Sequence, residues 1–374
     1  MDENNQKKKI QIVVVVFVAI CFLFVIIHRL YDRNKSYSSY KVEYNLEISD
    51  GVDNTFYPFV SGVLKYSSDG ISYINDGKEV WNHGFEMKNP LFDVCGEYIA
   101  IAESDTNDVN IYNAKGEKYK ISVQYPIKEV EVSRQGVVAA VSADEDADYI
   151  ELVSKDGTRI AIGRTVLDGD GYPLDISISP DATKVAASYL AVSSGEVKTK
   201  VVFYNYSEVG QEQTDRIVGG FNDFGTAIIP DIEFVDLDTA IAVGDDILVI
   251  YDIKETPSER ARVSVNQEIL SVVYNERYIA LITENEETGK RRIEMYTMNG
   301  KQKMSQELDF QYNDMKIAGS SVLLYNDTEC QIYSSAGVKK FDYKFNMGIT
   351  SIVPLDDESF IFVSGKNVQK IVLK

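Results

Sequence analysis

The stretch Asp175-Ile-Ser-Ile-Ser-Pro-Asp-Ala-Thr-Lys-Val-Ala-Ala-Ser188 contains two short apolar segments joined by a turn. Ser179-Pro180-Asp181 favours the turn, because proline presets its own φ and an aspartate side chain accepts hydrogen bonds from nearby backbone N–H groups. The segment that follows is made of small and β-branched residues, which suit a strand covered on both faces. The stretch therefore predicts a hairpin in the interior of an all-β fold.

The second strand of this hairpin recurs about every 40 residues, a period that is typical of a β-propeller. Its copies begin at Tyr98, Val137, Lys184, Thr239, Tyr278, Ser321 and Ser359. Several copies are followed by a third strand with a polar glycine turn, as in Ile111–Gly116 and Met295–Gly300. Glycine in these turns supplies the positive φ that tight hairpins require.

We predict an all-β propeller of about eight four-stranded blades, or seven if the weak first unit is only a partial blade. The units are 57–87, 88–123, 124–167, 168–222, 223–266, 267–309, 310–347 and 348–374. The last unit is short, and residues 40–48 alternate in the manner of a strand. We expect this strand to complete the last blade and close the ring, because closure removes two exposed sheet edges. The predicted propeller domain is therefore 40–374.

An apolar run at residues 10–27 contains a single polar residue, Gln11. As a helix it would extend about 27 Å, close to the thickness of a bilayer core. A cleaved signal peptide or a lipoprotein signal would need small residues that are absent at the end of the run and immediately before Cys21. We predict a transmembrane signal anchor over 10–30, preceded by a cytoplasmic tail of residues 1–9 and followed by a linker over 31–39. Flanking basic residues are nearly balanced, so the exported orientation rests on the tight cluster Lys7–Lys9.

Two resemblances follow from these features. The turn Ser179-Pro180-Asp181 with Val185-Ala186 resembles the S-P-D-x-x-x-V-A turn of WD40-like and TolB-like propellers. The layout of the whole chain resembles an uncharacterised clostridial family of single-span membrane proteins with an exported propeller. The resemblance implies a fold and an anchor, and it implies no activity.

The charge is uneven along the chain. The formal charge is −20 overall and +3 over residues 1–35, which leaves −23 on the remainder. So acidic a surface repels phosphate backbones and argues against nucleic acid as a partner. Solubility explains part of this charge, and attraction of a basic partner or of cations is the alternative.

Few residues offer chemistry. The two histidines are His28 and His83, and His83 is interpreted as a solvated residue of a turn after an outer strand. Asp144, Asp146 and Asp148 form a weak calcium candidate that lacks the glycine and the terminal glutamate of an EF-hand loop. Cys95 and Cys330 are interpreted as two free buried thiols in corresponding parts of different repeats, with a disulfide as the alternative. We predict no catalytic constellation and no cofactor.

The function predicted from these features is a membrane-tethered, extracytoplasmic, non-enzymatic module that binds a protein, peptide or cell-envelope ligand. Loops of the fourth unit, Ala191–Lys200 and Tyr206–Ala227, are the longest insertions and are expected to carry recognition. One alternative is a hydrolase of envelope glycans or peptides that uses carboxylates in the propeller channel. A second alternative is a structural anchor whose propeller spaces other components.

Overall fold

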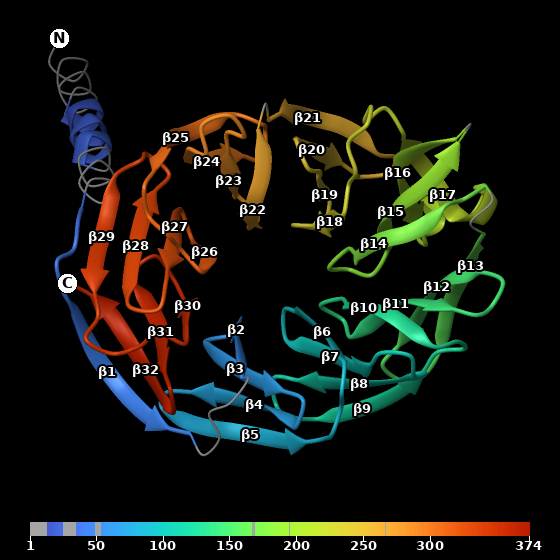
Figure 1. Ribbon diagram of the computed structural model, residues 1–374, viewed down its shortest axis with the longest axis horizontal. Coiled ribbons are helices and arrows are strands. Elements are labelled where there is room, and N and C mark those ends of the chain that lie inside the picture. The colour runs from blue at the N-terminus through green and yellow to red at the C-terminus, as the bar shows by residue number, and fades with distance from the viewer. Residues whose placement is uncertain (1–12, 25–34, 49–53, 167–168, 194, 266) are drawn as a thin grey trace, which may run out of the picture.

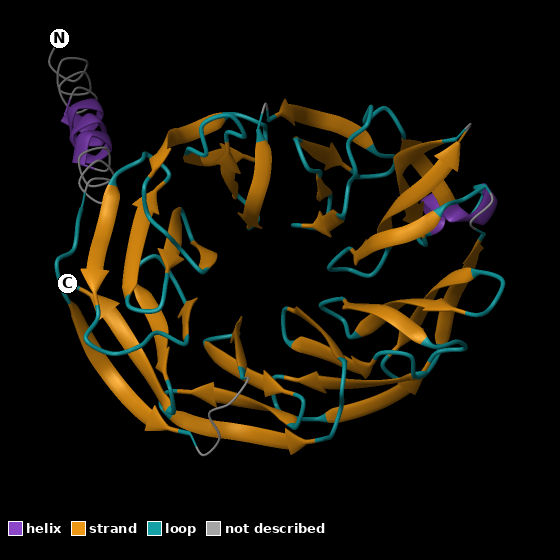
Figure 2. Ribbon diagram, viewed as in Figure 1, coloured by secondary structure: helices purple, strands orange, loops and turns teal. Residues whose placement is uncertain are grey.

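A ring of eight four-stranded antiparallel sheets surrounds a common axis in the computed structural model (Figure 1). The structure describes residues 13–24, 35–48, 54–166, 169–193, 195–265 and 267–374. Apart from one N-terminal helix and two short 3-10 turns, the described regular structure is β (Figure 2). The prediction of an eight-bladed all-β propeller is confirmed, and the seven-bladed alternative is wrong, because the weak first unit forms a complete sheet.

Within each blade the first strand is innermost and the fourth is outermost. The first strands are β2 (Thr55–Phe59), β6 (Pro90–Cys95), β10 (Ile127–Val132), β14 (Tyr172–Ile178), β18 (Asp231–Phe234), β22 (Glu268–Tyr274), β26 (Asp314–Ala318) and β30 (Ser351–Pro354). The second strands are β3 (Gly62–Ser67), β7 (Tyr98–Glu103), β11 (Val137–Ala143), β15 (Lys184–Ser193), β19 (Thr239–Val243), β23 (Tyr278–Glu284), β27 (Ser321–Tyr325) and β31 (Ser359–Ser364).

The outer half of each blade follows the same pattern. The third strands are β4 (Gly70–Asn75), β8 (Asp108–Asn113), β12 (Asp148–Ser154), β16 (Glu196–Asn205), β20 (Ile247–Asp252), β24 (Arg291–Thr297), β28 (Glu329–Ser334) and β32 (Asn367–Leu373). The fourth strands of blades 1 to 7 are β5 (Lys78–Gly84), β9 (Lys118–Ser122), β13 (Arg159–Thr165), β17 (Ile217–Phe221), β21 (Ser258–Ser264), β25 (Gln302–Leu308) and β29 (Lys339–Lys344). The short helices η1 (Glu208–Gly210) and η2 (Thr214–Arg216) lie between β16 and β17.

The eighth blade joins the two ends of the propeller. Its fourth strand is β1 (Tyr40–Glu47), which pairs antiparallel with β32, with Tyr40 opposite Leu373. Blades pack through the second strands, whose side chains are buried on both faces, as in β19 with every residue buried. Eight clusters of buried apolar residues fill the spaces between neighbouring blades, including a cluster around Phe203 and Tyr251 between blades 4 and 5. This is the environment that the recurring apolar strands predict.

The connections divide the ring into two faces. Turns between the first and second strands and between the third and fourth strands form one face, which we call the turn face. Connections between the second and third strands, together with those from one blade to the next, form the opposite loop face. The chain reaches β1 on the turn face, where Tyr37 donates its backbone N–H to Lys340 O at 2.7 Å. Whatever precedes Lys35 therefore joins the propeller at the rim of the turn face.

Residues 13–24 form a helix outside the ring (Figure 2), and its large apolar side chains are exposed, with Val13 and Phe22 each 67% exposed. The predicted apolar run over 10–27 extends beyond the described residues at both ends. In the part of the chain that the structure describes, no helix has both the length and the apolar character needed to cross a bilayer.

Two local expectations are wrong. His83 lies inside β5, opposite Ile71, and not in a turn, because the register of β4 and β5 continues to Gly84. Most of the expected loop Ala191–Lys200 is strand, because β15 and β16 continue to pair through Val192 and Val197. The side chains of these two valines are 68% and 52% exposed, so the fourth blade carries an extended hairpin on the loop face.

Candidate functional site

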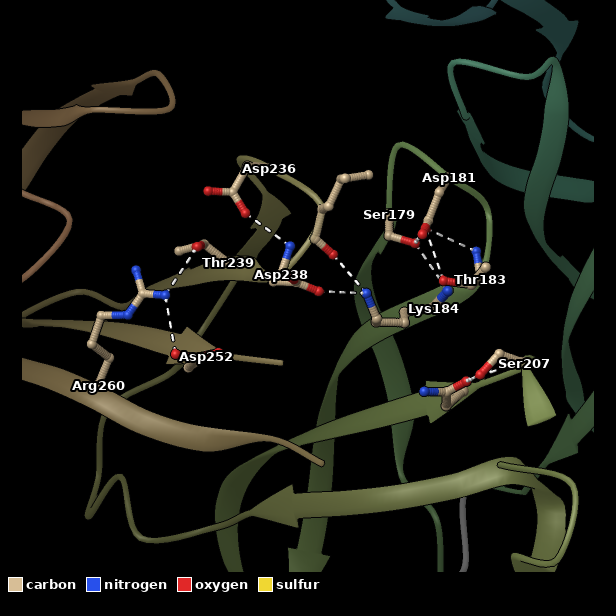
Figure 3. A network of polar contacts seen from close by, with 12 residues as sticks. Ser179, Asp181, Thr183, Lys184, Ser207, Asp236, Asp238, Thr239, Asp252 and Arg260 are labelled. Atoms are coloured by element: carbon tan, nitrogen blue, oxygen red, sulfur yellow. Dashed lines mark hydrogen bonds and ion pairs between the residues drawn. The ribbon is translucent and has the colours of Figure 1, made fainter. Parts of the chain in front are cut away.

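The turn face is held together by polar contacts that run from blade to blade. In the Ser179-Pro180-Asp181 turn, Asp181 Oδ1 accepts hydrogen bonds from Ser179 Oγ at 2.7 Å and Thr183 Oγ1 at 2.8 Å. Lys184 is only 5% exposed, and its Nζ donates to Leu237 O at 2.7 Å and pairs with Asp238 at 3.0 Å in the fifth blade (Figure 3). The buried ammonium is therefore fully compensated, as a buried charge must be.

The same arrangement continues around the turn face. Arg260 of the fifth blade donates to Thr239 Oγ1 at 3.2 Å and pairs with Asp252 at 3.4 Å within its own blade (Figure 3). It also donates through Nη1 to Met298 O of blade 6 at 3.5 Å. Asn275 Nδ2 donates to Gly319 O at 2.8 Å, which links blades 6 and 7. Asp357 of the eighth blade accepts the backbone N–H of Ser320 at 2.9 Å. These groups bind neighbouring blades to one another, so we assign the turn face a structural role.

A second set of polar groups lies on the innermost strands of blades 2 to 5. Carboxylates there lie beside apolar residues of the same strands and are partly buried; they are Asp93, Glu129, Glu131, Asp175, Asp231 and Glu233. Three of them accept a backbone N–H from the next blade, in the pairs Asp93 with Val132 at 2.7 Å, Glu129 with Ile176 at 3.0 Å and Asp175 with Ile232 at 2.6 Å. Each accepted bond satisfies a donor that the inner sheet edge would otherwise leave unpaired.

Burial, joined at several positions by repulsion between neighbouring carboxylates, raises the pKa of these groups. Burial raises the pKa of Asp93 to about 6 against the opposing effect of its backbone hydrogen bonds. Burial, with repulsion from Asp93 and Glu233, raises the pKa of Glu131 well above its usual range. Burial also raises the pKa of Asp175, and its carboxyl is hydrogen-bonded to that of Glu129, so this pair retains a proton at neutral pH.

The hydrogen-bonded pair Glu129 and Asp175 does not have glycosidase geometry. Carboxyl groups in glycosidases stand about 5 Å or more apart, whereas a hydrogen bond brings two oxygens to about 3 Å or less. Both carboxyls also accept a backbone N–H from the next blade. The arrangement fits groups that join blades, and it gives no support to the glycan-hydrolase alternative.

An open pocket of about 860 Å³ lies on the loop face between blades 5 and 6. Five exposed carboxylates line it: Asp245 and Asp246 before β20, Glu268 at the start of β22, and Glu286 and Glu287 before β24. None of the five forms an ion pair within the described residues. The basic residue nearest in sequence, Lys290, pairs instead with Glu307 at 3.2 Å.

Backbone hydrogen bonds and a few side-chain acceptors fix the walls of this pocket; Asp245 Oδ1 accepts the backbone N–H of Asp246 at 3.1 Å. Val265 N donates to Asp246 O at 2.8 Å, and Ile269 N donates to Asp245 O at 3.0 Å. Asn285 Oδ1 accepts hydrogen bonds from the backbone N–H and the hydroxyl of Thr288, both at 2.9 Å. Five carboxylates thus surround one concavity, and no basic side chain lines it among the described residues. Such an arrangement attracts positively charged groups. We call this site the acidic pocket.

The predicted calcium residues are not gathered around one point. Asp144 Oδ1 accepts the backbone N–H groups of Asp146 and Ala147, and its Oδ2 accepts the Tyr149 hydroxyl at 2.9 Å. In the described ranges, no three carboxylate, imidazole or thiol groups lie close enough to hold one metal ion. The loop's own donors thus use both Asp144 oxygens. The calcium site at Asp144, Asp146 and Asp148 stays a prediction.

The remaining candidates have structural surroundings. The Nε2 atom of His83 lies 2.8 Å from Gly116 O, and the His83 ring packs against Tyr112. Both partners belong to blade 2, so His83 connects blade 1 with blade 2. Cys95 and Cys330 are free thiols. They do not occupy corresponding positions, since Cys95 ends an innermost strand and Cys330 lies in a third strand.

A family model matches residues 33–373, which is nearly the whole propeller chain. The chain belongs to DUF5711, a family of unknown function. Among curated proteins, no relative matches the sequence.

Three solved structures share the propeller architecture. BamB from Moraxella catarrhalis is 12% identical, with a TM-score of 0.55, over 90% of this chain and 100% of that one. AztD from Citrobacter koseri is 10% identical, with a TM-score of 0.52, over 84% and 90% of the two chains. A eukaryotic initiation factor is 14% identical, with a TM-score of 0.52, over 80% and 79%. At these identities the similarity shows the fold alone.

Proposed function

We propose that this DUF5711 protein is a non-enzymatic binding module whose acidic pocket captures a basic segment of a protein or peptide. The single observation that carries the proposal is the group of five carboxylates that line the pocket and form no ion pair within the described residues. The net charge of the propeller favours the same class of partner, because its long-range field attracts basic chains and repels nucleic acid.

The proposal includes a tether. We propose that residues 10–30 anchor the chain in the cell membrane, with the propeller outside the cytoplasm. Two observations support this: the apolar run over 10–27 in the sequence, and the exposure of every described side chain in the 13–24 helix. An anchor that precedes Lys35 joins the rim of the turn face, so it leaves the acidic pocket on the opposite face unobstructed.

Charge reversal at the pocket tests the binding proposal. The probe is a fluorescently labelled peptide of alternating lysine and serine, titrated with the full-length chain and followed by fluorescence anisotropy. We expect Glu286→Lys with Glu287→Lys to weaken binding at least about tenfold at low salt, and we expect added salt to weaken binding to the wild type.

A matched reversal separates the pocket from net charge. Glu97→Lys with Glu255→Lys makes the same change in charge at two exposed positions on the turn face. We expect this variant to bind within about twofold of the wild type. Equal weakening by both double variants would mean that the peptide senses only the overall charge, and the pocket would lose its assigned role.

Protease accessibility on intact cells tests the location separately. Digestion of the propeller from outside is the expected result. Protection that ends only on lysis would place the propeller in the cytoplasm, and the binding proposal would then apply to an intracellular partner.

A further inference from the structure

A second pocket, of about 480 Å³, opens on the outer side of the ring between blades 3 and 4. Its apolar lining includes Ile150, Ala161 and Tyr204, which belong to the packed cluster between these two blades. The strand β13 and the segment from η2 into β17 also line it, with Ile217 as an exposed aliphatic side chain. The volume is that of a small-molecule site, and the lining combines these apolar side chains with charged ones. We call this site the outer pocket.

One guanidinium nitrogen at the outer pocket lacks a hydrogen-bond partner among the described residues. Arg216 lines the pocket, and its Nη1 atom is buried without a hydrogen bond to any described residue. A buried guanidinium nitrogen without an acceptor is costly, and such orphaned groups are rare in folded proteins. Arg216 has a backbone φ of 63°, directly after Asp215 at 52°. Two successive residues in the left-handed backbone conformation therefore set the course of the chain at the pocket. Residues in this region of φ each cost energy, and they gather at ligand sites.

The other charged groups around the outer pocket already have partners or lie exposed at its edge. Arg164 interacts with the Tyr149 hydroxyl. Asp170 Oδ2 accepts the backbone N–H of Val166 at 3.0 Å. Asp215 is exposed. Among the described cations of the outer pocket, Arg216 is therefore the one with a buried donor, Nη1, that a ligand could satisfy.

We infer that the outer pocket binds a small aliphatic carboxylate, with its carboxylate on Arg216 and its hydrocarbon part on the apolar lining. A planar guanidinium takes a carboxylate through two parallel hydrogen bonds, which supplies the missing acceptor for Nη1. The shared chemistry fits either a free aliphatic acid or the C-terminus of a peptide that ends in an aliphatic residue. This site is separate from the acidic pocket and does not depend on it.

The structure offers a way to fill the outer pocket without distorting the strand. Gly163 lines the pocket in β13 with an ordinary strand conformation, and the nearest atom to a Cβ added there is Ile150 O at 3.9 Å. Valine at this position suits a strand and projects into open space. Gly163→Val is therefore a filled-pocket variant that keeps Arg216 in place.

The test uses the purified full-length chain and saturation-transfer NMR. The probes are 4-methylpentanoate, its neutral amide, N-acetyl-valyl-leucine with a free carboxylate, and the amide of that peptide. We expect at least one of the two acids to bind about tenfold or more tightly than its own amide. Which acid binds then tells a free acid from a peptide terminus.

Variants complete the test. Arg216→Gln and Gly163→Val are each expected to weaken acid binding at least about tenfold, while the exposed control Arg277→Gln stays within about twofold. Gly163→Val keeps the test decisive if Arg216→Gln fails to fold. The inference is overturned if the amides bind as well as the acids, if folded Arg216→Gln binds like the wild type, or if neither acid binds at about 10 mM.

Discussion

Two neighbouring regions on opposite faces of this propeller differ in how their charged side chains are paired. On the turn face of blades 4 and 5, Lys184 and Arg260 are paired with carboxylates and backbone oxygens of their own or the next blade. On the loop face of blades 5 and 6, five carboxylates surround a pocket and form no ion pair in the described structure. Paired groups hold a ring together, whereas unpaired charge of one sign is available to a partner. Under the proposed function, structural contacts and recognition lie on opposite faces of the ring.

The innermost strands connect the two faces and give the largest predicted effect. Burial raises the pKa of Asp93 to about 6 and that of Glu131 well above its usual range, so the folded protein binds more protons than the unfolded chain above pH 4. The stability that these groups contribute is fully present below their pKa in the unfolded chain. It is lost as the pH rises through their pKa in the folded protein. One such group contributes about 1.4 kcal/mol per pH unit. We expect the free energy of unfolding to fall by about 3 kcal/mol or more from pH 5 to pH 7, measured with urea at fixed salt.

A pair of variants separates the inner carboxylates from the acidic pocket. Glu131→Gln removes one titrating group from the inner strands and is expected to flatten the pH profile. Glu268→Gln removes an exposed carboxylate of the pocket and is expected to leave the slope unchanged. A wild-type profile that is flat or rises with pH would contradict the account of the inner strands.

The turn face gives the next largest effect. Lys184→Met keeps the aliphatic stem but removes the hydrogen bond to Leu237 O and the ion pair with Asp238. We expect the free energy of unfolding to fall by about 2 kcal/mol, because an unpaired buried acceptor remains. The control Lys254→Met, at an exposed position on the same face, is expected to change it by less than about 0.5 kcal/mol. Equal stability of the two variants would show that the turn-face network does not hold the blades.

The loop face gives the smallest effect on stability. Glu286→Gln with Glu287→Gln removes two charges from the acidic pocket without changing side-chain size. We expect urea unfolding to show a change within about 0.5 kcal/mol at pH 7, since these side chains form no ion pair in the described structure. A loss comparable with that of Lys184→Met would mean that the pocket carboxylates support the fold, and the contrast between the faces would fail.

The fold was largely readable from the sequence because the repeated second strands are buried on both faces. Short runs such as Val137–Val141 therefore keep their apolar pattern in every blade. Local errors arose where the strand pairing continued past the expected boundary. His83 looked like a turn residue beside Asn82 and Gly84, but β4 and β5 remain paired through it. A loop was likewise expected over Ala191–Lys200, but β15 and β16 remain paired there through Val192 and Val197.

The sites were harder to predict, because each combines residues that are distant in the sequence. The acidic pocket brings Asp245 together with Glu287 from the next blade, and the outer pocket brings Gly163 together with Arg216. One signal was available for the inner carboxylates. Acidic residues alternate with apolar ones in the first strands of neighbouring units, as in Ile127–Val132 and Asp231–Phe234. That alternation indicates a charged face toward the axis, but it does not show which carboxylates share protons.

The location of a bound basic peptide tests the separation of the two faces most directly. A lysine–serine peptide carrying a photo-activatable benzophenone is bound to the full-length chain, irradiated, and mapped by mass spectrometry. If the peptide binds in the acidic pocket, crosslinks are expected on the loop face of blades 5 and 6, at residues 244–246, 267–268 and 285–290. Crosslinks at the turn-face segments 253–257 and 298–301, or an even distribution around the ring, would contradict this separation of the two faces.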